Sequence, residues 1–128
     1  MNTIKVVAAI IKKGNKILIA KRKTGEFKGK YEFPGGKIET GETCEQALIR
    51  EIYEELEASI IIEKYFMNVY YKYTDYILDM KCYICTLKNN QIKLNDHFEI
   101  KWITLNEQNI DWIPADIKII EQLKEQGL

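Results

Sequence analysis

The chain has 128 residues, of which 46% are hydrophobic and 30% are charged. This size and composition predict one compact globular domain, residues 1–128, that buries a core without disulfides. The net charge is zero, which argues against a nucleic-acid polymer as partner because such binders carry a basic excess. No apolar run reaches the roughly 20 residues that cross a membrane, and no cleavable leader is recognisable. We therefore expect a soluble, cytoplasmic protein.

The three cysteines of the chain are Cys44, Cys82 and Cys85. An odd number without a disulfide framework is typical of a reducing compartment. Cys82 and Cys85 form a CxxC pattern, but residues three apart in a strand point to opposite faces of the sheet. We expect two packed thiols rather than a redox or metal pair.

The first half of the chain predicts strands followed by one helix. Residues 3–12 and 16–22 are apolar runs separated by Gly14-Asn15, as in a hairpin. Residues 23–30 form a basic loop, 31–33 a short extended piece, and Gly35-Gly36 a tight loop after Pro34. Thr43 and Gln46 have the spacing of a capping box, which predicts a helix over 44–56. Its apolar stripe is expected to comprise Leu48, Ile49, Ile52 and Leu56.

The second half predicts three strands and a second helix. Residues 59–71 and 74–87 are rich in aromatic and β-branched residues and should be long strands joined by a bend near 72–73. Residues 98–103 alternate as a last strand does. Pro114 is expected to be the first residue of the second helix, with apolar positions Ile117, Ile119, Ile120 and Leu123.

Between residues 39 and 57 there are seven glutamates and one arginine, Arg50. Like charges three or four residues apart on a helix cost about 0.2–0.5 kcal/mol per pair, so something must compensate for them. Helical spacing puts Glu51, Glu54 and Glu55 on one stripe. A solvated acidic face is one interpretation. The other is a magnesium site, because oxygen-only ligands suit hard cations and no histidine or cysteine cluster favours zinc.

The spacing of these residues resembles the Nudix box, Gx5Ex7REUxEExGU, where U is aliphatic. Gly36, Glu42 and the run 50–56, REIYEEL, match the box, whereas Glu57 replaces its last glycine and Ala58 its last aliphatic residue. The segments VVAAII, EFPGGKIE and WIPADIKIIEQL extend the resemblance to small MutT-type and CTP-type pyrophosphohydrolases over essentially the whole chain. The resemblance implies a Nudix fold, an α/β (α+β) structure with a mixed β-sheet between helices as an α/β/α sandwich.

The resemblance also implies a metal site for Mg²⁺, for which Mn²⁺ can substitute. Its predicted ligands are the Gly36 carbonyl, Glu51, Glu54, Glu55 and a loop carboxylate, Asp96. Glu99 is the alternative loop carboxylate, and His97 between them is a possible base or an ordinary exposed histidine. Glu54 is expected to be the most important carboxylate. Arg50 is expected to hold the glutamates by charge-assisted hydrogen bonds, and Glu42 to orient Arg50 or a water.

Four further residues are predicted to bind substrate: Arg22 and Lys37 the phosphates, Phe33 and Asp116 the base. In MutT enzymes that read oxidised guanine an asparagine commonly stands at the position of Asp116. An ionised aspartate only accepts hydrogen bonds, so it would prefer a donor edge such as the cytosine amine or guanine N1 and N2, unless it is buried and protonated. This departure argues against strict specificity for oxidised guanine.

The function implied is Mg²⁺-dependent hydrolysis of (deoxy)nucleoside triphosphates, such as 8-oxo-dGTP or cytidine nucleotides, to nucleoside monophosphate and pyrophosphate. This activity would sanitise the nucleotide pool. The alternatives are an ADP-ribose or dinucleoside polyphosphate hydrolase and, in another class, a non-catalytic nucleotide-binding regulatory module. The sequence leaves monomer and homodimer open. At Glu57 we expect a changed helix exit and an intact active site.

Overall fold

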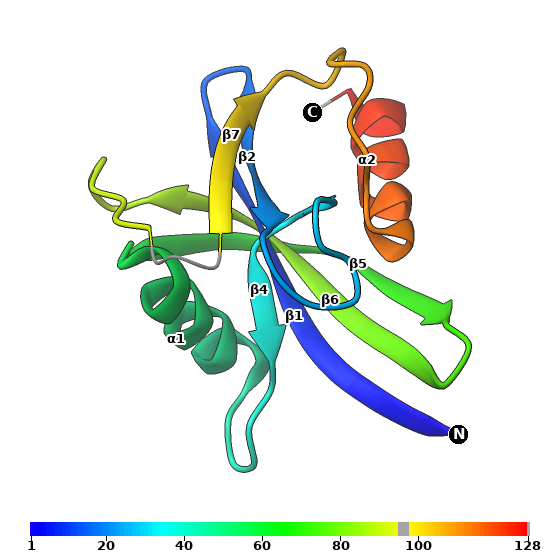
Figure 1. The fold of residues 1–128 in the computed structure, drawn as a ribbon. Helices are drawn as coiled ribbons and strands as arrows, with labels where there is room; N and C mark the ends of the chain where they lie inside the picture. The colour runs from blue at the N-terminus through cyan, green and yellow to red at the C-terminus, as the bar shows by residue number, and fades with distance from the viewer. Residues whose placement is uncertain (95–97, 128) are drawn as a thin grey trace.

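The computed structural model describes residues 1–94 and 98–127 (Figure 1). Its elements, in chain order, are β1 (Asn2–Lys13), β2 (Lys16–Arg22), β3 (Tyr31–Glu32), β4 (Gly35–Lys37), α1 (Cys44–Leu56), β5 (Ile60–Lys72), β6 (Tyr76–Leu87), β7 (Phe98–Ile103) and α2 (Pro114–Gln126). The predicted bounds of both helices and of the last strand therefore agree closely with the structure.

The strands form one mixed sheet of seven strands with β1 at its centre. Along the main path the order is β3-β2-β1-β6-β5, while β4 pairs with β1 and β7 pairs with β2. β1 runs antiparallel to β2, as the predicted hairpin requires, and parallel to β6. The helices lie on opposite sides of these strands (Figure 1). The predicted mixed sheet between helices is thus confirmed.

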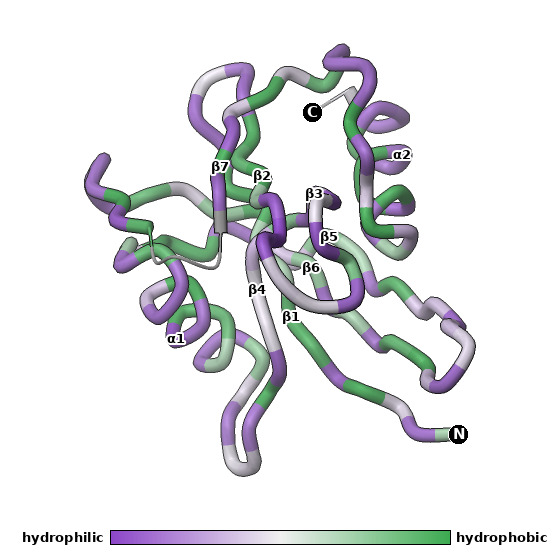
Figure 2. Tube along the Cα trace, in the orientation of Figure 1, coloured by the Kyte–Doolittle hydropathy of each residue, from purple (hydrophilic) through white to green (hydrophobic). Residues whose placement is uncertain are grey.

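Two hydrophobic clusters fill the space between the sheet and the helices. Because side chains alternate along a strand, Val7 and Ala9 of β1 pack on the α1 side, whereas Ala8 and Ile10 pack on the α2 side. In Figure 2 green segments run along β1 and β2, β4 and β7 are mostly pale or purple, and the tip of the loop between β4 and α1 is purple and white. The sheet therefore has an apolar layer on both faces.

The two strand cysteines follow the same alternation. Cys82 belongs to the cluster on the α2 side and Cys85 to the cluster on the α1 side. Both thiols are buried and free. They are packed side chains on opposite faces, as predicted, and not a CxxC pair.

Helix α1 begins at a complete capping box. The Gln46 N–H donates to Thr43 Oγ1 at 3.1 Å, and the Thr43 N–H donates to Gln46 Oε1 at 3.0 Å. The buried residues of the helix are Ala47, Leu48, Ile52 and Leu56. The prediction that Ile49 faces the core is wrong, since this side chain is 48% exposed. One residue is 100° of rotation, which carries Ile49 past the edge of the buried stripe.

Residues 35–37 form strand β4, whereas the sequence predicted a loop there. β4 pairs antiparallel with β1, with Val7 opposite Gly36 and Ala8 opposite Gly35. A Cβ on Gly35 would overlap the carbonyl oxygen of Val7. The glycine is therefore needed for a close backbone approach rather than for a turn.

The exit of α1 also differs from expectation. Glu57 takes the left-handed conformation that a glycine would take, with φ 46°, and its N–H donates to the Tyr53 carbonyl at 2.9 Å. The Lys93 N–H donates to the Leu56 carbonyl at 2.7 Å and satisfies a further helix-end acceptor. The helix exit is therefore not changed; Glu57 adopts the strained geometry itself, at a cost of about 1 kcal/mol.

Helix α2 starts with Pro114 at its first position, as predicted, and ends at Gly127 with φ 71°. Ile119, Ile120 and Leu123 are buried, whereas Ile117 is 42% exposed and does not join the core face. Within residues 1–94 and 98–127, neither helix has the length and hydropathy needed to span a membrane.

Candidate active site

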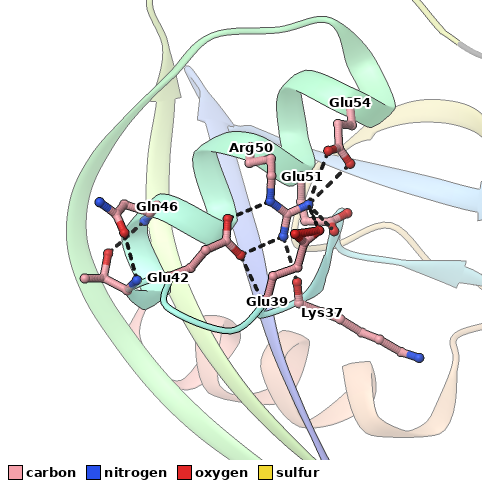
Figure 3. A network of polar contacts seen from close by, with 8 residues as sticks. Lys37, Glu39, Glu42, Gln46, Arg50, Glu51 and Glu54 are labelled. Atoms are coloured by element: carbon pink, nitrogen blue, oxygen red, sulfur yellow. Dashed lines mark hydrogen bonds and ion pairs between the residues drawn. The ribbon is translucent and has the colours of Figure 1, made fainter.

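A single arginine on α1 organises the acidic cluster (Figure 3). The Arg50 guanidinium donates to both oxygens of Glu42, from Nε at 2.6 Å and from Nη2 at 2.9 Å. Nη2 also donates to the Lys37 carbonyl at 3.0 Å, and Nη1 to Glu51 Oε1 at 2.9 Å. Nη1 lies 3.3 Å from both oxygens of Glu54. Arg50 thus ties the start of the loop, the loop glutamate and the helix together.

The network offsets the repulsion expected among the glutamates. Hydrogen bonds from Arg50 lower the pKa of the Glu42 carboxyl to about 2. Hydrogen bonding to Glu42, and then to Glu51 and Glu54, raises the pKa of Arg50. Such charge-assisted bonds are shorter and stronger than neutral ones. The contacts of Arg50 with Glu42, Glu51 and Glu54 are present in the geometry, whereas no bond from Arg50 to Glu55 is found among the described residues.

Gly36 on β4 lies directly against the carboxylate of Glu51. A Cβ at this position would overlap the carboxyl carbon and both oxygens of that side chain. The contact brings strand β4 close to the acidic helix α1. The predicted metal ligand on this strand, the Gly36 carbonyl, requires such an approach. Glycine at 36 is accordingly dictated by the approach of β4 to α1.

Glu55 occupies the least compensated position of the cluster. Burial raises the pKa of its carboxyl to about 9, and the negative charges of Glu32 and Glu51 add to the effect. Only Arg22 acts in the opposite direction. A partly buried group of carboxyls short of positive charge is a donor set that fits a hard divalent cation.

The structure does not bring all the predicted ligands together. Glu51 has only 18% of its side chain exposed and faces Gly36, whereas Glu54 is 57% exposed and is held by Arg50. Among the described residues, no three acidic, histidine or cysteine side chains are arranged as a group that holds a metal ion. Asp96 and His97 lie outside the described residues. The ligand set consequently stays a prediction.

A pocket beside this cluster is lined by residues from both halves of the chain. Its aromatic walls are Phe27, Phe33, Tyr73 and Tyr76, and its charged residues are Arg22, Glu32 and Asp116. Gly35 and Gly36 also line it. Because Gly36 touches Glu51, the pocket opens directly beside the acidic helix.

Two residues of the pocket lining, Asp116 and Phe33, are in contact. Asp116 Oδ2 accepts a hydrogen bond from the Phe33 N–H at 2.8 Å, and the Phe33 ring stacks on Trp112 with centroids 5.4 Å apart. Asp116 is only 4% exposed, and burial raises the pKa of its carboxyl to about 8. At neutral pH this carboxyl is therefore largely protonated, which is the exception anticipated from the sequence.

Arg22 and Glu32 form a bidentate ion pair inside the pocket. Arg22 Nε donates to Glu32 Oε2 at 2.6 Å and Nη2 to Oε1 at 3.1 Å. The Glu32 side chain is 15% exposed and that of Arg22 is 40% exposed. Burial raises the pKa of the Glu32 carboxyl, although the ion pair pulls it down. The predicted phosphate contact Arg22 is thus oriented by a partly buried carboxylate.

The other predicted residues lie apart from the pocket lining. The side chain of Lys37 is exposed and extends away from Arg50 (Figure 3); only its carbonyl joins the network. Glu99 on β7 forms an exposed ion pair with Lys21, with Nζ and Oε2 3.5 Å apart. The contacts of these two side chains therefore do not bring either of them to the acidic cluster.

Several pocket residues have no role in the prediction from the sequence. For Glu32 the available signal is its position directly before Phe33 in EFPGG. Tyr73 and Tyr76 belong to the aromatic-rich segment predicted as two strands and a bend, and Phe27 belongs to the loop predicted as basic. These aromatic residues come together in the pocket because the loop at 23–30 approaches the bend before β6. The ring centroids of Phe27 and Tyr73 lie 5.4 Å apart there.

The fold and the site define an α/β/α protein in which a glycine strand, an acidic helix and an aromatic pocket meet. The model of the NUDIX domain family matches residues 6–122, and the chain belongs to this family. It is 32% identical over 123 residues to the CTP pyrophosphohydrolase of Escherichia coli, covering 94% of this chain and 91% of the relative. It is 30% identical over 127 residues to the 8-oxo-dGTP diphosphatase of the same organism, covering 97% and 98%.

A solved structure supports the same fold. The MutT NUDIX hydrolase from Burkholderia pseudomallei superposes with a TM-score of 0.88 and 23% identity, covering 96% of this chain and 99% of that one. At this identity the likeness concerns the fold alone. It agrees with the mixed sheet between two helices described above.

Proposed function

We propose that the protein is a Mg²⁺-dependent pyrophosphohydrolase that converts (deoxy)nucleoside triphosphates, of the cytidine or oxidised-guanine type, into nucleoside monophosphate and pyrophosphate. The observation that carries the proposal is the continuity of the aromatic pocket with the acidic helix through Gly36, which touches Glu51 and lines the pocket. Names of two relatives, CTP pyrophosphohydrolase and 8-oxo-dGTP diphosphatase, support the same substrate class. Such an enzyme would remove unwanted nucleotides from the pool.

The pocket supplies what a nucleobase requires. Aromatic rings on its walls offer stacking surfaces, and Asp116 offers a polar group in its lining. With its carboxyl protonated, Asp116 donates one hydrogen bond while Oδ2 still accepts from Phe33. A neutral carboxyl therefore selects a base edge that presents an acceptor, and an ionised one selects a donor.

On the acidic side, Gly36, Glu51, Glu54 and Glu55 would hold the metal. When bound, Mg²⁺ screens the triphosphate charge and favours attack by water on phosphorus. Arg50 keeps the carboxylates of Glu51 and Glu54 in position. We assign to Glu54, the more exposed of the two helix carboxylates that Arg50 contacts, the role of accepting the proton of the attacking water. The new bond joins the water oxygen to phosphorus, and pyrophosphate leaves with the electron pair of the broken bridge bond.

The test is product identification with the purified protein. It is incubated with Mg²⁺ and CTP, dCTP, dGTP, 8-oxo-dGTP, ADP-ribose or a dinucleoside polyphosphate, and the products are separated and identified. Nucleoside monophosphate with pyrophosphate from a triphosphate is the expected result. Turnover of ADP-ribose or the dinucleoside alone would replace the proposal with the runner-up hydrolase, and binding without turnover across the panel would favour a regulatory module.

A further inference from the structure

We propose that Glu32 is a positioning residue, which holds Arg22 by one edge so that the free edge of the guanidinium contacts the α-phosphate of the bound nucleotide. This inference rests on the proposed function and deepens it. It gives a role to a partly buried carboxylate that the hydrolytic chemistry itself does not use.

The first observation is the way in which the two side chains meet. Arg22 uses Nε and Nη2 for the two oxygens of Glu32, which is the side-on, two-bond arrangement of arginine with a carboxylate. A guanidinium has five N–H groups in a fixed plane. Within the described residues, Nη1 of Arg22 forms no hydrogen bond, so its two N–H groups remain available to a ligand.

The second observation is the position of the pair along the pocket. Arg22 and Glu32 line the same cavity as Asp116, the proposed base contact, and Gly36, the neighbour of Glu51. In a nucleotide the α-phosphate lies between the base and the remaining phosphates. A cation that lines the same pocket as the proposed base contact and the neighbour of the acidic helix therefore matches the α-phosphate, and Arg22 is the only cation among the described lining residues.

The third observation is that the side chain of Glu32 is less exposed than that of Arg22. Glu32 lies on β3, where it pairs with Ala20 of β2, and its side chain is 15% exposed. Arginine side chains lose much rotamer freedom when they are fixed, so an unheld Arg22 would have to be ordered by the ligand itself. The Phe27 ring, 6.0 Å from the guanidinium carbon, gives weaker support. Glu32 thus prepares Arg22 before the nucleotide binds.

The closest alternative role for Glu32 is in the acidic cluster, because its charge acts on Glu55. The two roles predict different measurements. If Glu32 acts through Arg22, its replacement changes nucleotide affinity without divalent metal and has no effect once Arg22 is absent. If it acts on the cluster, its replacement changes the metal requirement whether or not Arg22 is present.

The experiment compares Glu32→Gln, Arg22→Ala and the double variant, with Glu63→Gln as control. Glu63 lies on β5, where its side chain accepts an exposed hydrogen bond from Thr86 of β6. It is not part of the pocket lining. Titration calorimetry measures the Kd of CMP and 8-oxo-dGMP in EDTA, and kinetics measures kcat, KM and the Mg²⁺ concentration for half-maximal rate. Thermal melting of each variant checks that it is folded.

We expect Glu32→Gln to raise Kd and KM by about 10-fold or more, the size expected when a charge-assisted bond is lost, with a smaller change in kcat. The Kd and KM of the double variant should equal those of Arg22→Ala alone, and those of Glu63→Gln should equal the wild-type values. Arg22→Lys keeps the charge but not the fork, and should reproduce the loss if Glu32→Gln proves poorly folded.

Additive effects of Glu32→Gln and Arg22→Ala on Kd would overturn the inference. So would a shift of the Mg²⁺ requirement by Glu32→Gln at unchanged nucleotide affinity. In both cases the wild type would still hydrolyse triphosphates, and the proposed function would stand. A wild type that neither binds nor hydrolyses any nucleotide would contradict the proposed function and this inference together.

Discussion

The carboxylate of Asp116, at the start of α2, accepts a hydrogen bond from the backbone N–H of Phe33, 83 residues away, at 2.8 Å. The contact ties the C-terminal helix to the segment between β3 and β4. It is also made by a carboxyl that is protonated in the folded protein near neutral pH, because burial raises its pKa to about 8. The protonation of Asp116 is therefore linked to stability as well as to the choice of base.

Replacing Asp116 by asparagine should remove part of the pH dependence of stability. The folded-state pKa of about 8 lies above the ordinary value of 3.8, so the folded protein holds a proton that the unfolded chain releases between these values. Wild-type stability therefore declines as pH rises through this window, by about 1.4 kcal/mol for each pH unit from this group. Asp116→Asn should be the more stable protein at pH 8, with the difference shrinking towards pH 4. Denaturant unfolding at several pH values measures it, and a constant difference would contradict the assignment.

Arg50 should tolerate no substitute, including lysine. A lysine cannot reproduce the two bonds to Glu42 together with those to Glu51 and the Lys37 carbonyl. We expect Arg50→Lys to lose activity by about 10- to 100-fold, as for other residues that orient metal ligands. Steady-state kinetics and metal titration measure the loss. Glu39→Gln is the matched control: its carboxylate is 64% exposed at 3.4 Å from Arg50, and near-equal losses in both variants would argue against the role of Arg50.

Alanine substitutions at the two neighbouring glycines of β4 should have different effects, one on activity and the other on stability. The atoms nearest to a Cβ at 36 belong to the carboxylate of Glu51, a flexible side chain, whereas those nearest to a Cβ at 35 belong to the backbone of Val7 and Ala8. Gly36→Ala should fold but lose about 100-fold in activity, because the carboxylate is displaced. Gly35→Ala should lose about 1–3 kcal/mol of stability, because the strand must move. Melting curves and rates for both variants test this, and equal stability losses would refute the distinction.

Glycine at position 57 should stabilise the protein without changing its activity. Glu57 has φ 46° and forms only a long, exposed ion pair with Lys93 at 3.8 Å. Relief of the left-handed strain should contribute about 1 kcal/mol, offset slightly by the lost pair. Chemical denaturation of Glu57→Gly measures the gain, with Glu57→Ala as the control that keeps the strain. A less stable Glu57→Gly would show that the ion pair outweighs the strain.

Glu54→Gln should fold normally and lose about 10²–10⁴-fold in kcat, the range expected for a missing general base. Its side chain is 57% exposed and its only contact among the described residues is Arg50, so the amide should not disturb packing. Rates are compared with those of Glu45→Gln, on the same helix, whose contact is the Tyr83 hydroxyl. Turnover at the wild-type rate would mean that Glu54 is not the central carboxylate.

Features that depend on neighbours in sequence were predictable. The helix over 44–56 follows from a capping box and an apolar period within one segment, and the structure begins and ends it at the same residues. The opposite orientation of Cys82 and Cys85 follows from strand alternation alone. Which residues at the edge of a helix stripe are buried is harder to predict. Ile49 lies at this border, and its exposure depends on how α1 is rotated against the sheet.

Most of the local elements, the family and the grouping of glutamates around Arg50 can be predicted from short-range patterns, because capping, periodicity and the box act over short separations. The three-dimensional fold is needed to see that Gly35–Lys37 is a strand on β1, that Glu32 holds Arg22, and that Asp116 is buried against Phe33. Each of these depends on backbone pairing or burial between distant segments. Hydrogen bonds and desolvation are set by the three-dimensional surroundings of a group, and these shift the pKa of Asp116 while its sequence neighbours do not.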